Sequence, residues 1–273
     1  MQELPEVEII VRGLKKNILG LKVEEFKIIN KRLRYDISNI MSVLYNKKTI
    51  KHIFRIGKYG IIILSGKYHI MFHLGMTGKF RFSKNSNDKK KHDHISIRLN
   101  NGIILTYNDV RKFGYFSIIS NPINLYKFKN LGKEPFLLKN SASLLWEALK
   151  NKKKNLKSLL LDQGFIAGIG NIYASEILFD SKIYPFEIAN KLNKSRFYKL
   201  LESTEKILKK AISKGGVTIK DYQNINGELG YFKNNLKVYG REGLTCFNCK
   251  NLIIKVKRYG RSTFYCKNCQ KKI

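Results

Sequence analysis

Four cysteines, all within the last 28 residues, constrain this chain more than any other feature. They form two Cys-x2-Cys pairs, Cys246 with Cys249 and Cys266 with Cys269, and sixteen residues separate the pairs. This is the spacing of a four-thiolate structural zinc site, because each pair supplies two sulfurs of a tetrahedron. The alternatives are two disulfides or idle cysteines. The chain has no other cysteine and no secretory hydrophobic segment, which favours a reducing compartment and one structural Zn²⁺.

The residues between the two cysteine pairs predict a β-hairpin. Leu252–Ile254 and Thr263–Tyr265 are strand-like, and Tyr259-Gly260 marks a turn between them. One metal would then pin both ends of a finger. The finger also carries positive charge, which favours contact with nucleic acid, at Lys255, Lys257, Arg258 and Arg261.

Charge points to the same kind of partner. Among 273 residues, Lys and Arg number 53 and Asp and Glu 20, which gives a formal net charge of +33 and implies a polyanionic partner. An AT-rich genome would also enrich Lys, Ile and Asn in any protein, so charge favours nucleic-acid binding without establishing it. No apolar run approaches the roughly 18 residues that a membrane helix needs. We therefore expect a cytoplasmic protein with no membrane partner.

The first half of the chain predicts one helix followed by β-structure. Residues 5–19 have apolar side chains at helical spacing after Pro5. From residue 21 to 120 short β-rich runs follow, and Asn100-Asn101-Gly102 is the clearest hairpin turn. An antiparallel sandwich or barrel is the expected architecture. The β-runs are Val23–Ile29, Gly60–Leu64, His69–Leu74, Ile95–Leu99, Ile103–Tyr107 and Tyr115–Ile119.

The second half predicts helices. We expect an α+β multidomain protein with an N-terminal β-sandwich domain over 1–120 and a linker over 121–142. A helical DNA-binding domain follows over 143–235, and a zinc-finger β-hairpin over 236–273. Within the helical part, residues 215–235 are polar and glycine-bearing, and we expect a mobile loop there. The helical segments are Ser143–Leu149, Leu156–Leu161, Asn171–Phe179 and Ser195–Ser213.

Two glycine-bordered loops are candidates for inserting side chains into DNA. In His73–Gly78, Met76 lies between two glycines, which cannot wall it into a core, so it is suited to wedge between bases. Asn108–Gly114 offers Arg111 and Phe113 two residues apart. Each loop, taken alone, is better explained as a plain hairpin. Three acids lie at the amino terminus, Glu3, Glu6 and Glu8. They either interact favourably with the positive end of the helix dipole or take part in catalysis.

A third glycine turn, Gly168-Ile169-Gly170, leads into the helix that begins at Asn171. Backbone N–H groups at such a helix start form a phosphate site, and the helix–turn–helix pattern around it predicts a helix–two-turn–helix unit. The turn lacks the strand and spacing of a dinucleotide fingerprint, so no nucleotide cofactor is expected. Nearby positive charge, which could also be a solvated helix face, comes from Lys152, Lys153, Lys154 and Lys157.

Taken together, these motifs resemble the formamidopyrimidine-DNA glycosylases, bifunctional base-excision enzymes. The endonuclease VIII group shares the architecture, but Leu4 after Glu3, the Met76 turn and the context of Arg261 favour the first branch. The resemblance extends from Glu3 to Gln270 and rests on Glu3–Glu8, Lys58-Tyr59, His73–Gly78, Lys91–His94, Arg111–Gly114, Gly168–Glu176, Gly215-Gly216, Gly230–Phe232, Val238–Arg241 and Arg261–Cys269.

The resemblance implies a role for each matching residue. Glu3 would protonate the sugar ring oxygen as the glycosidic bond breaks, Lys58 would assist β-elimination, and Arg261 would assist δ-elimination. Met76, Arg111 and Phe113 would fill the gap left by the extruded base, which costs a few kcal/mol to flip. The implied substrate is duplex DNA with an oxidised purine, bound by a monomer in the bacterial cytoplasm. The residues that would hold the DNA backbone are His92, Arg111, Lys153 and Asn171.

One position departs from the family pattern. The family uses an N-terminal proline, exposed by methionine removal, as the amine that attacks C1′; this chain has Gln2. A free amine on Met1 would be displaced by up to about 3.5 Å of chain, which is large when placement matters at the ångström level. Four interpretations remain: the Gln2 amine substitutes, the Met1 amine folds back, Lys58 or Glu3 supports slow excision, or the chain only binds damaged DNA.

Overall fold

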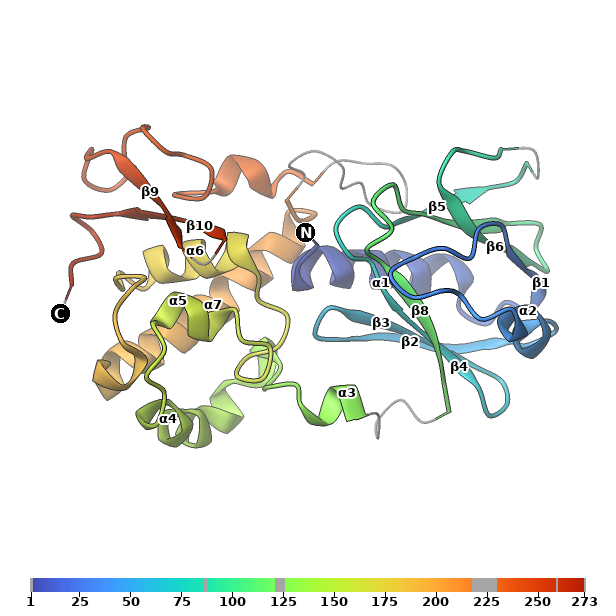
Figure 1. Cartoon of the computed structure of the whole chain (residues 1–273), viewed down its shortest axis with the longest axis horizontal. Coiled ribbons are helices and arrows are strands. Elements are labelled where there is room, and N and C mark those ends of the chain that lie inside the picture. Colours follow the sequence, from blue (N-terminus) through green and yellow to red (C-terminus); the bar gives the residue numbers. More distant parts are fainter. Residues whose placement is uncertain (1, 86–87, 121–125, 218–229, 259, 273) are drawn as a thin grey trace. The chain divides into compact units, whose positions relative to one another are not determined.

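The computed structural model describes residues 2–85, 88–120, 126–217, 230–258 and 260–272 (Figure 1). The chain divides into two compact units. Unit 1 comprises Met1–Lys129 and Lys214–Tyr231, and unit 2 comprises Asn130–Ser213 and Phe232–Ile273. Among the described residues, no helix is both long enough and apolar enough to cross a bilayer.

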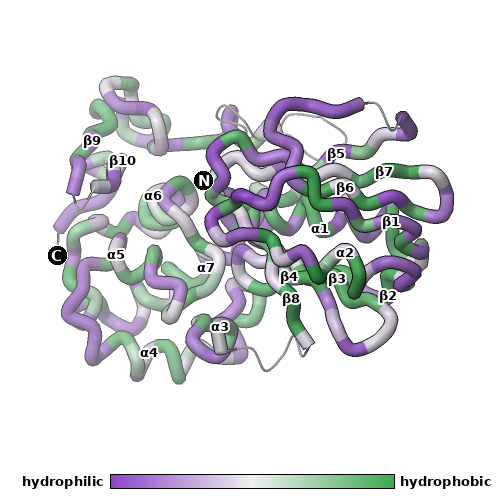
Figure 2. The backbone as a smooth tube through the Cα atoms, turned by 45° about the vertical axis from the view of Figure 1, so that its right-hand side comes forward, coloured by the Kyte–Doolittle hydropathy of each residue, from purple (hydrophilic) through white to green (hydrophobic). Residues whose placement is uncertain are grey.

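Unit 1 holds two four-stranded antiparallel sheets. One has the strand order β1-β6-β7-β5 and the other β2-β3-β4-β8. In Figure 2 the hydrophobic residues of this unit fall mainly on its strands and the hydrophilic ones on its loops. The strands are β1 Val23–Ile28, β2 Ile50–Ile56, β3 Tyr59–Leu64, β4 His69–His73, β5 Lys79–Ser83, β6 Asp93–Leu99, β7 Ile104–Asn108 and β8 Tyr115–Ile119; the helices are α1 Leu4–Ile18, α2 Ile40–Tyr45 and α3 Tyr126–Lys129.

Helix α1 fastens the amino terminus to this sandwich. Its apolar side chains recur at helical spacing and enter a core that takes residues from both sheets. Glu3 is the N-cap, Pro5 occupies the first turn, and the Glu6 carboxylate accepts the Glu3 N–H at 3.0 Å. This capping box fixes where the helix begins. The chain immediately before α1 is therefore held in one place.

Unit 2 combines helices with a C-terminal β-hairpin. Helix α6 is buried on almost all sides, as expected for a helix that is apolar all round, and packs against α7 and β10. The helices are α4 Ala142–Lys150, α5 Leu156–Leu160, α6 Asn171–Asp180 and α7 Lys194–Ser213, with 3₁₀ turns at Pro135–Leu137, Lys139–Ser141, Ala189–Lys191 and Phe232–Asn235; the hairpin strands are β9 Ile253–Arg258 and β10 Arg261–Cys266.

A buried carboxylate anchors the start of the C-terminal segment in unit 2. Glu176 on α6 accepts backbone N–H groups from Lys237, Val238 and Tyr239 at 2.8–2.9 Å. Burial raises the pKa of Glu176, against the opposing effect of these three donors. The hairpin that carries the cysteines thus starts from a fixed point on α6.

The expected fold class is confirmed: an N-terminal helix, antiparallel sheets, a helical region and a C-terminal cysteine-bearing hairpin are all present. The Asn101-Gly102 turn joins β6 to β7 as predicted. Four helices or strands were not anticipated, namely α2, α3, β2 and β5. Residues 218–229 of the predicted mobile loop lie outside the described residues, and the domain boundaries remain predictions.

Candidate functional site

Glu3 lies in a buried segment at the start of α1. Its exposed fraction is 1%, and those of Gln2 and Glu6 are 4% and 2%. Glu6 uses both carboxylate oxygens: one accepts the Glu3 N–H, and the other accepts the Val217 N–H at 2.9 Å. Glu6 therefore links the Glu3 backbone to the chain that follows Gly215-Gly216. A Cβ at Gly216 would approach the Glu6 carboxylate to 3.0 Å, so this close passage favours glycine.

Gln2 connects this segment to the turn that carries Met76. Its backbone N–H donates to the Gly75 carbonyl at 3.3 Å, and its side-chain Nε2 donates to the Gly78 carbonyl. The two acceptors are the first and last residues of the turn Gly75–Gly78. One residue next to Glu3 thus spans the whole turn.

The Met76 turn is joined in the same way to the loop Asn108–Gly114. The Thr77 hydroxyl donates to the fully buried Asp109 carboxylate and accepts the Arg111 N–H at 3.0 Å. Asp109 also accepts the Gly114 N–H at 2.8 Å. A Cβ at Gly75 would come within 2.5 Å of the Gly114 backbone, so the two loops touch through glycine.

The predicted DNA-contacting side chains of unit 1 come together on these loops. Met76 is half-buried, Phe113 is 43% exposed, and the Arg111 guanidinium lies 4.7 Å from the Phe113 ring centre. His92 joins the group through its carbonyl, which accepts the Asp109 N–H at 3.0 Å. A cation and two apolar groups are therefore presented by one hydrogen-bonded pair of loops, and the segment that carries His92 is bonded to that pair.

Lys58 lies at the turn between β2 and β3 and is 8% exposed. The next residue, Tyr59, pairs with His73 at the end of β4, and their rings are 5.2 Å apart. Since the Met76 turn begins directly after β4, this register places Lys58 beside the start of that turn. Before Lys58, the Gly57 carbonyl accepts a hydrogen bond from Arg55, which pairs with Glu8 at 2.9 Å.

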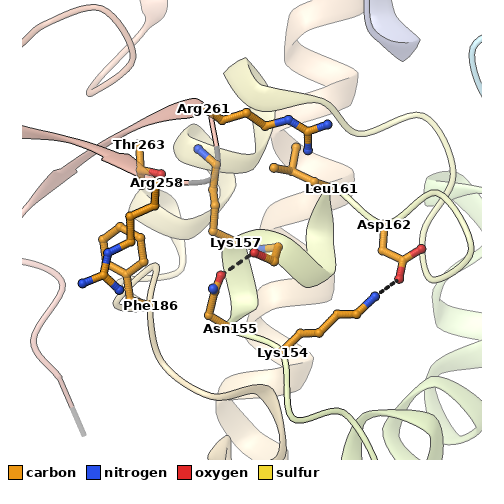
Figure 3. A pocket seen from close by; sticks show the side chains of 10 residues that line it. Lys154, Asn155, Lys157, Leu161, Asp162, Phe186, Arg258, Arg261 and Thr263 are labelled. Carbon is orange, nitrogen blue, oxygen red and sulfur yellow. Dashed lines mark hydrogen bonds and ion pairs between the residues drawn. The ribbon is translucent and has the colours of Figure 1, made fainter.

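Unit 2 has a positively charged pocket of about 280 Å³ between α5 and the hairpin (Figure 3). Arg261 reaches over it from β10, and Arg258 stacks on Phe186 with 4.5 Å to the ring centre. Its only carboxylate among the described lining residues, Asp162, pairs with Lys154 at 2.9 Å. The pocket therefore suits an anion. The lining residues are Lys154, Asn155, Lys157, Ser158, Leu161, Asp162, Phe186, Arg258, Arg261 and Thr263.

Lys157, which lines this pocket, and Asn171, which is bonded to the hairpin, are both held by hydrogen bonds. The Asn171 side chain donates to the Ser262 carbonyl of β10 at 2.9 Å, which ties the start of α6 to the hairpin. Lys157 is 3% exposed and donates to the Ser175 hydroxyl at 2.6 Å. The solvated-face interpretation is therefore wrong for Lys157, whereas Lys153 is exposed in the segment between α4 and α5.

The four cysteine sulfurs gather at the base of the hairpin, all within 4.8 Å of one another. The Sγ atoms of Cys249 and Cys266 are 3.4 Å apart, and those of Cys246 and Cys269 are 3.9 Å apart. A tetrahedron with Zn–S bonds of 2.3 Å has sulfur–sulfur edges of about 3.8 Å. The Asn248 N–H also donates to Cys246 Sγ at 3.4 Å, as suits a thiolate. The donor set and its spacing fit a metal ion.

Sequence reasoning did not single out two residues that organise the unit 1 site. Asp109 was visible only as one acid in a loop, although Asn and Asp side by side are typical of turns. Gln2 was noted for the residue it replaces and not for its own amide. Both residues are recognisable by their hydrogen-bond partners, which lie 32 residues away for Asp109 and 76 residues away for Gln2. A single sequence does not reveal such distant pairs.

Comparison with known proteins identifies relatives of the whole chain. The family model described as the formamidopyrimidine-DNA glycosylase N-terminal domain matches residues 1–116, and the H2TH domain model of the same enzymes matches residues 131–223. The formamidopyrimidine-DNA glycosylase of Rickettsia africae (strain ESF-5) is 40% identical over 271 residues, which cover 99% of each chain.

Solved structures of Lactococcus lactis Fpg agree. One is a complex with DNA containing an abasic site and another a complex with DNA containing N7-benzyl-Fapy-dG. Each matches with a TM-score of 0.90 and 36% identity, covering 99% of this chain and 100% of the other.

Proposed function

This chain belongs to the formamidopyrimidine-DNA glycosylase family, and we propose that its two units supply the residues for excising oxidised purines from duplex DNA. The family activity is that of a DNA glycosylase and abasic-site lyase in base-excision repair. One observation carries the assignment of residues. The buried segment with Glu3 is hydrogen-bonded to the Met76 turn, which is bonded in turn to the loop with Arg111 and Phe113.

In unit 1, Glu3 is the proposed proton donor to the deoxyribose ring oxygen during cleavage of the glycosidic bond. Lys58, beside the start of the Met76 turn, is proposed to assist β-elimination at the abasic site. Met76, Arg111 and Phe113 are proposed to occupy the space that the extruded base leaves in the duplex. Their shared support on Asp109 and Thr77 lets them enter as one rigid group, which lowers the entropy lost on binding.

In unit 2, the anion pocket is proposed to receive the DNA backbone. Arg261 is the proposed assistant of δ-elimination, and Asn171 and Lys153 are proposed to contact phosphates, as is His92 in unit 1.

The cysteine cluster is proposed to hold one structural Zn²⁺. The ion would take no part in the reaction and would pin both ends of the hairpin that carries Arg261. The sulfur spacing and the N–H donor to Cys246 support this assignment. Zinc binding then contributes folding free energy to the finger.

We also propose a binding partner, an oligomeric state and a cellular location. The partner is double-stranded damaged DNA, bound by a monomer without a nucleotide cofactor in the bacterial cytoplasm. We propose domain boundaries after residues 120, 142 and 235. The endonuclease VIII-like alternative and the non-catalytic binder are not favoured by any relative reported above.

The test separates excision from strand cleavage. Duplex DNA with a single 8-oxoguanine is incubated with the protein under single-turnover conditions, and the released base and the cut strand are measured separately. We expect base release, and its loss in Glu3→Gln, since that variant lacks the proton donor. Retained affinity for the same duplex in Glu3→Gln would show that binding is intact. Base release in Glu3→Gln at the parent rate would remove Glu3 from the mechanism.

A further inference from the structure

Gln2 is buried, yet the hydrogen bonding of its side-chain amide is incomplete. The residue is 4% exposed, its Nε2 donates to the Gly78 carbonyl, and its Oε1 has no hydrogen-bond partner among the described residues. The orientation of the amide follows from chemistry, because the opposite orientation would set two carbonyl oxygens against each other. The buried Gln2 amide therefore has a hydrogen-bond partner for its Nε2 and none for its Oε1 among the described residues.

This arrangement is unfavourable for stability alone. Leaving a buried acceptor unpaired costs free energy, whereas an apolar side chain of the same length would fill the space without that cost. The benefit of an amide at this position lies in its donor. Both donors of Gln2, the backbone N–H and Nε2, are directed at carbonyls of one turn, Gly75–Gly78.

That turn needs an external restraint. It begins and ends with glycine, and Gly75 has a φ of +61°. Glycine gives a chain more conformations to lose than any other residue, so a glycine-bordered turn is soft unless bonds from outside hold it. Thr77 supplies two such bonds through its hydroxyl, which donates to Asp109 and accepts from the Arg111 N–H. Gln2 supplies two, one at each end of the turn, with Met76 between them.

We propose that Gln2 is a positioning residue that sets the Met76 side chain for recognition of damaged DNA. The proposal rests on the proposed function, since it gives Met76 the role of filling the vacated stack. Gln2 acts through the turn: its two hydrogen bonds limit the directions that Met76 can take before DNA arrives. Part of the ordering entropy is then lost on folding and not on binding.

The test uses Gln2→Met, which keeps the length of the side chain and removes both the donor and the unpaired acceptor. A matched control is Asn17→Leu near the far end of α1, which also loses one amide-to-carbonyl hydrogen bond, to Gly13. Amide hydrogen exchange is followed without DNA in peptides covering residues 74–79. Exchange there should become faster in Gln2→Met and stay unchanged in Asn17→Leu. Unchanged exchange in Gln2→Met would overturn the proposal whether or not the protein excises any base.

Binding gives the second readout. The ratio of affinities for duplexes with and without an abasic-site analogue is measured for the parent, Gln2→Met, Met76→Ala and the double variant. Gln2→Met should lower the ratio about three- to tenfold, the range that one lost hydrogen bond supports. The double variant should be no worse than Met76→Ala, because both changes act through one side chain. Fully additive losses would show that Gln2 does not act through Met76, whereas a parent with no lesion preference would instead contradict the proposed function.

Discussion

The Thr77 hydroxyl donates a hydrogen bond to the Asp109 carboxylate across 32 residues of sequence and joins the two loops that carry Met76, Arg111 and Phe113. Asp109 is fully buried and accepts from Thr77, from the Gly114 N–H and from the Tyr107 hydroxyl. Burial, and then the Asp109 charge and hydrogen bond, raise the pKa of Tyr107. Tyr107 thus stays a neutral donor at ordinary pH. One carboxylate sets the relative position of both loops.

We expect Asp109→Asn to destabilise the protein by about 1–3 kcal/mol, the cost of leaving a buried donor unpaired. The amide NH₂ would face one of the three donors that the carboxylate accepts. Urea unfolding measures the change. Asp180→Asn is the control, because Asp180 pairs with the exposed Lys206 and such pairs contribute about 1 kcal/mol or less. Equal stability of the two variants would contradict the assigned role of Asp109.

A second prediction concerns pH and the ion pair between Glu8 and Arg55, whose guanidinium also donates to the carbonyl of Gly57, the residue before Lys58. Burial opposes the charge on Glu8, but hydrogen bonds from Arg12 and Arg55 outweigh it and lower the pKa of Glu8 below 4.5. A carboxyl with a lowered folded-state pKa adds stability that is present above its unfolded pKa and is lost as pH falls through the folded value. Glu8→Gln should therefore be less stable than the parent at pH 7, and the difference should shrink below about pH 4.5.

The control for Glu8 is Glu147→Gln. Glu147 pairs with Lys150, and both side chains are more than half exposed, whereas the Arg55 side chain is 6% exposed. Glu147→Gln should change stability little at any pH. A stability difference in Glu8→Gln that is independent of pH would show that lost packing, and not the lost charge, is responsible.

The fold could be predicted where local patterns decide it. The apolar periodicity of α1, the Asn101-Gly102 turn and the cysteine spacing each identify one element through local rules. Strand β2 was missed because charged and polar residues interrupt Ile50–Ile56; it pairs with β3 through its backbone. Strand β5 was missed because its alternating Lys79–Ser83 is short and follows the Met76 turn directly.

The site could be predicted as motifs but not as an assembly. Met76 and Arg111 were each recognisable in their own loops, yet the contact between those loops depends on Thr77 and Asp109, which pair only in three dimensions. Lys157 illustrates the opposite error. A lysine beside Lys152–Lys154 suggests a solvated face, but its ammonium donates to Ser175 and stays buried. Tertiary hydrogen bonds decide both cases.

The cysteine cluster should bind one zinc ion per chain. Metal analysis of fresh, reduced protein measures the ratio, and a value well below one would contradict the assignment. Cys249→Ser should loosen the hairpin that carries Arg261 and abolish DNA binding, because the ligand set is then incomplete. Unit 1 should stay folded, since its core contains no residue of the hairpin. A hairpin unchanged in the Cys249→Ser variant would show that metal does not pin it.

Binding should be steeply salt-dependent, because Lys and Arg side chains displace counterions from phosphates. The logarithm of the binding constant is measured against the logarithm of salt concentration. Arg261→Gln should reduce the slope by about 1, the change expected for one lost phosphate contact. Arg98→Gln is the control, since Arg98 lies on β6 and pairs with Glu25. A binding constant that does not change with salt concentration would contradict the polyanion-binding role.

Met76→Ala should weaken the preference for lesion-containing DNA more than the affinity for undamaged DNA.

The last prediction concerns the nucleophile. Attack on C1′ needs an unprotonated amine within about 3–3.5 Å, and Gln2 supplies an amide where the family pattern has a terminal proline amine. We expect borohydride trapping on DNA with 8-oxoguanine to be weak in this chain and to rise in Gln2→Pro, in which proline permits methionine removal and presents a secondary amine. N-terminal sequencing verifies the processing. Glu3→Gln in that background should abolish base excision, because the ring oxygen then lacks its proton donor.

The same substitution should have an opposite effect on recognition. Proline has no side-chain amide, so Gln2→Pro loses the bond to the Gly78 carbonyl while it gains the amine. Trapping should therefore rise while the preference for lesion-containing over undamaged duplex falls, and the Gln2→Met variant should show the second change without the first. If the parent already traps as well as Gln2→Pro, the Gln2 or Met1 amine, or Lys58, reaches C1′ unaided. Displacement of the amine by one residue then does not prevent attack on C1′, and only the positioning role of Gln2 remains.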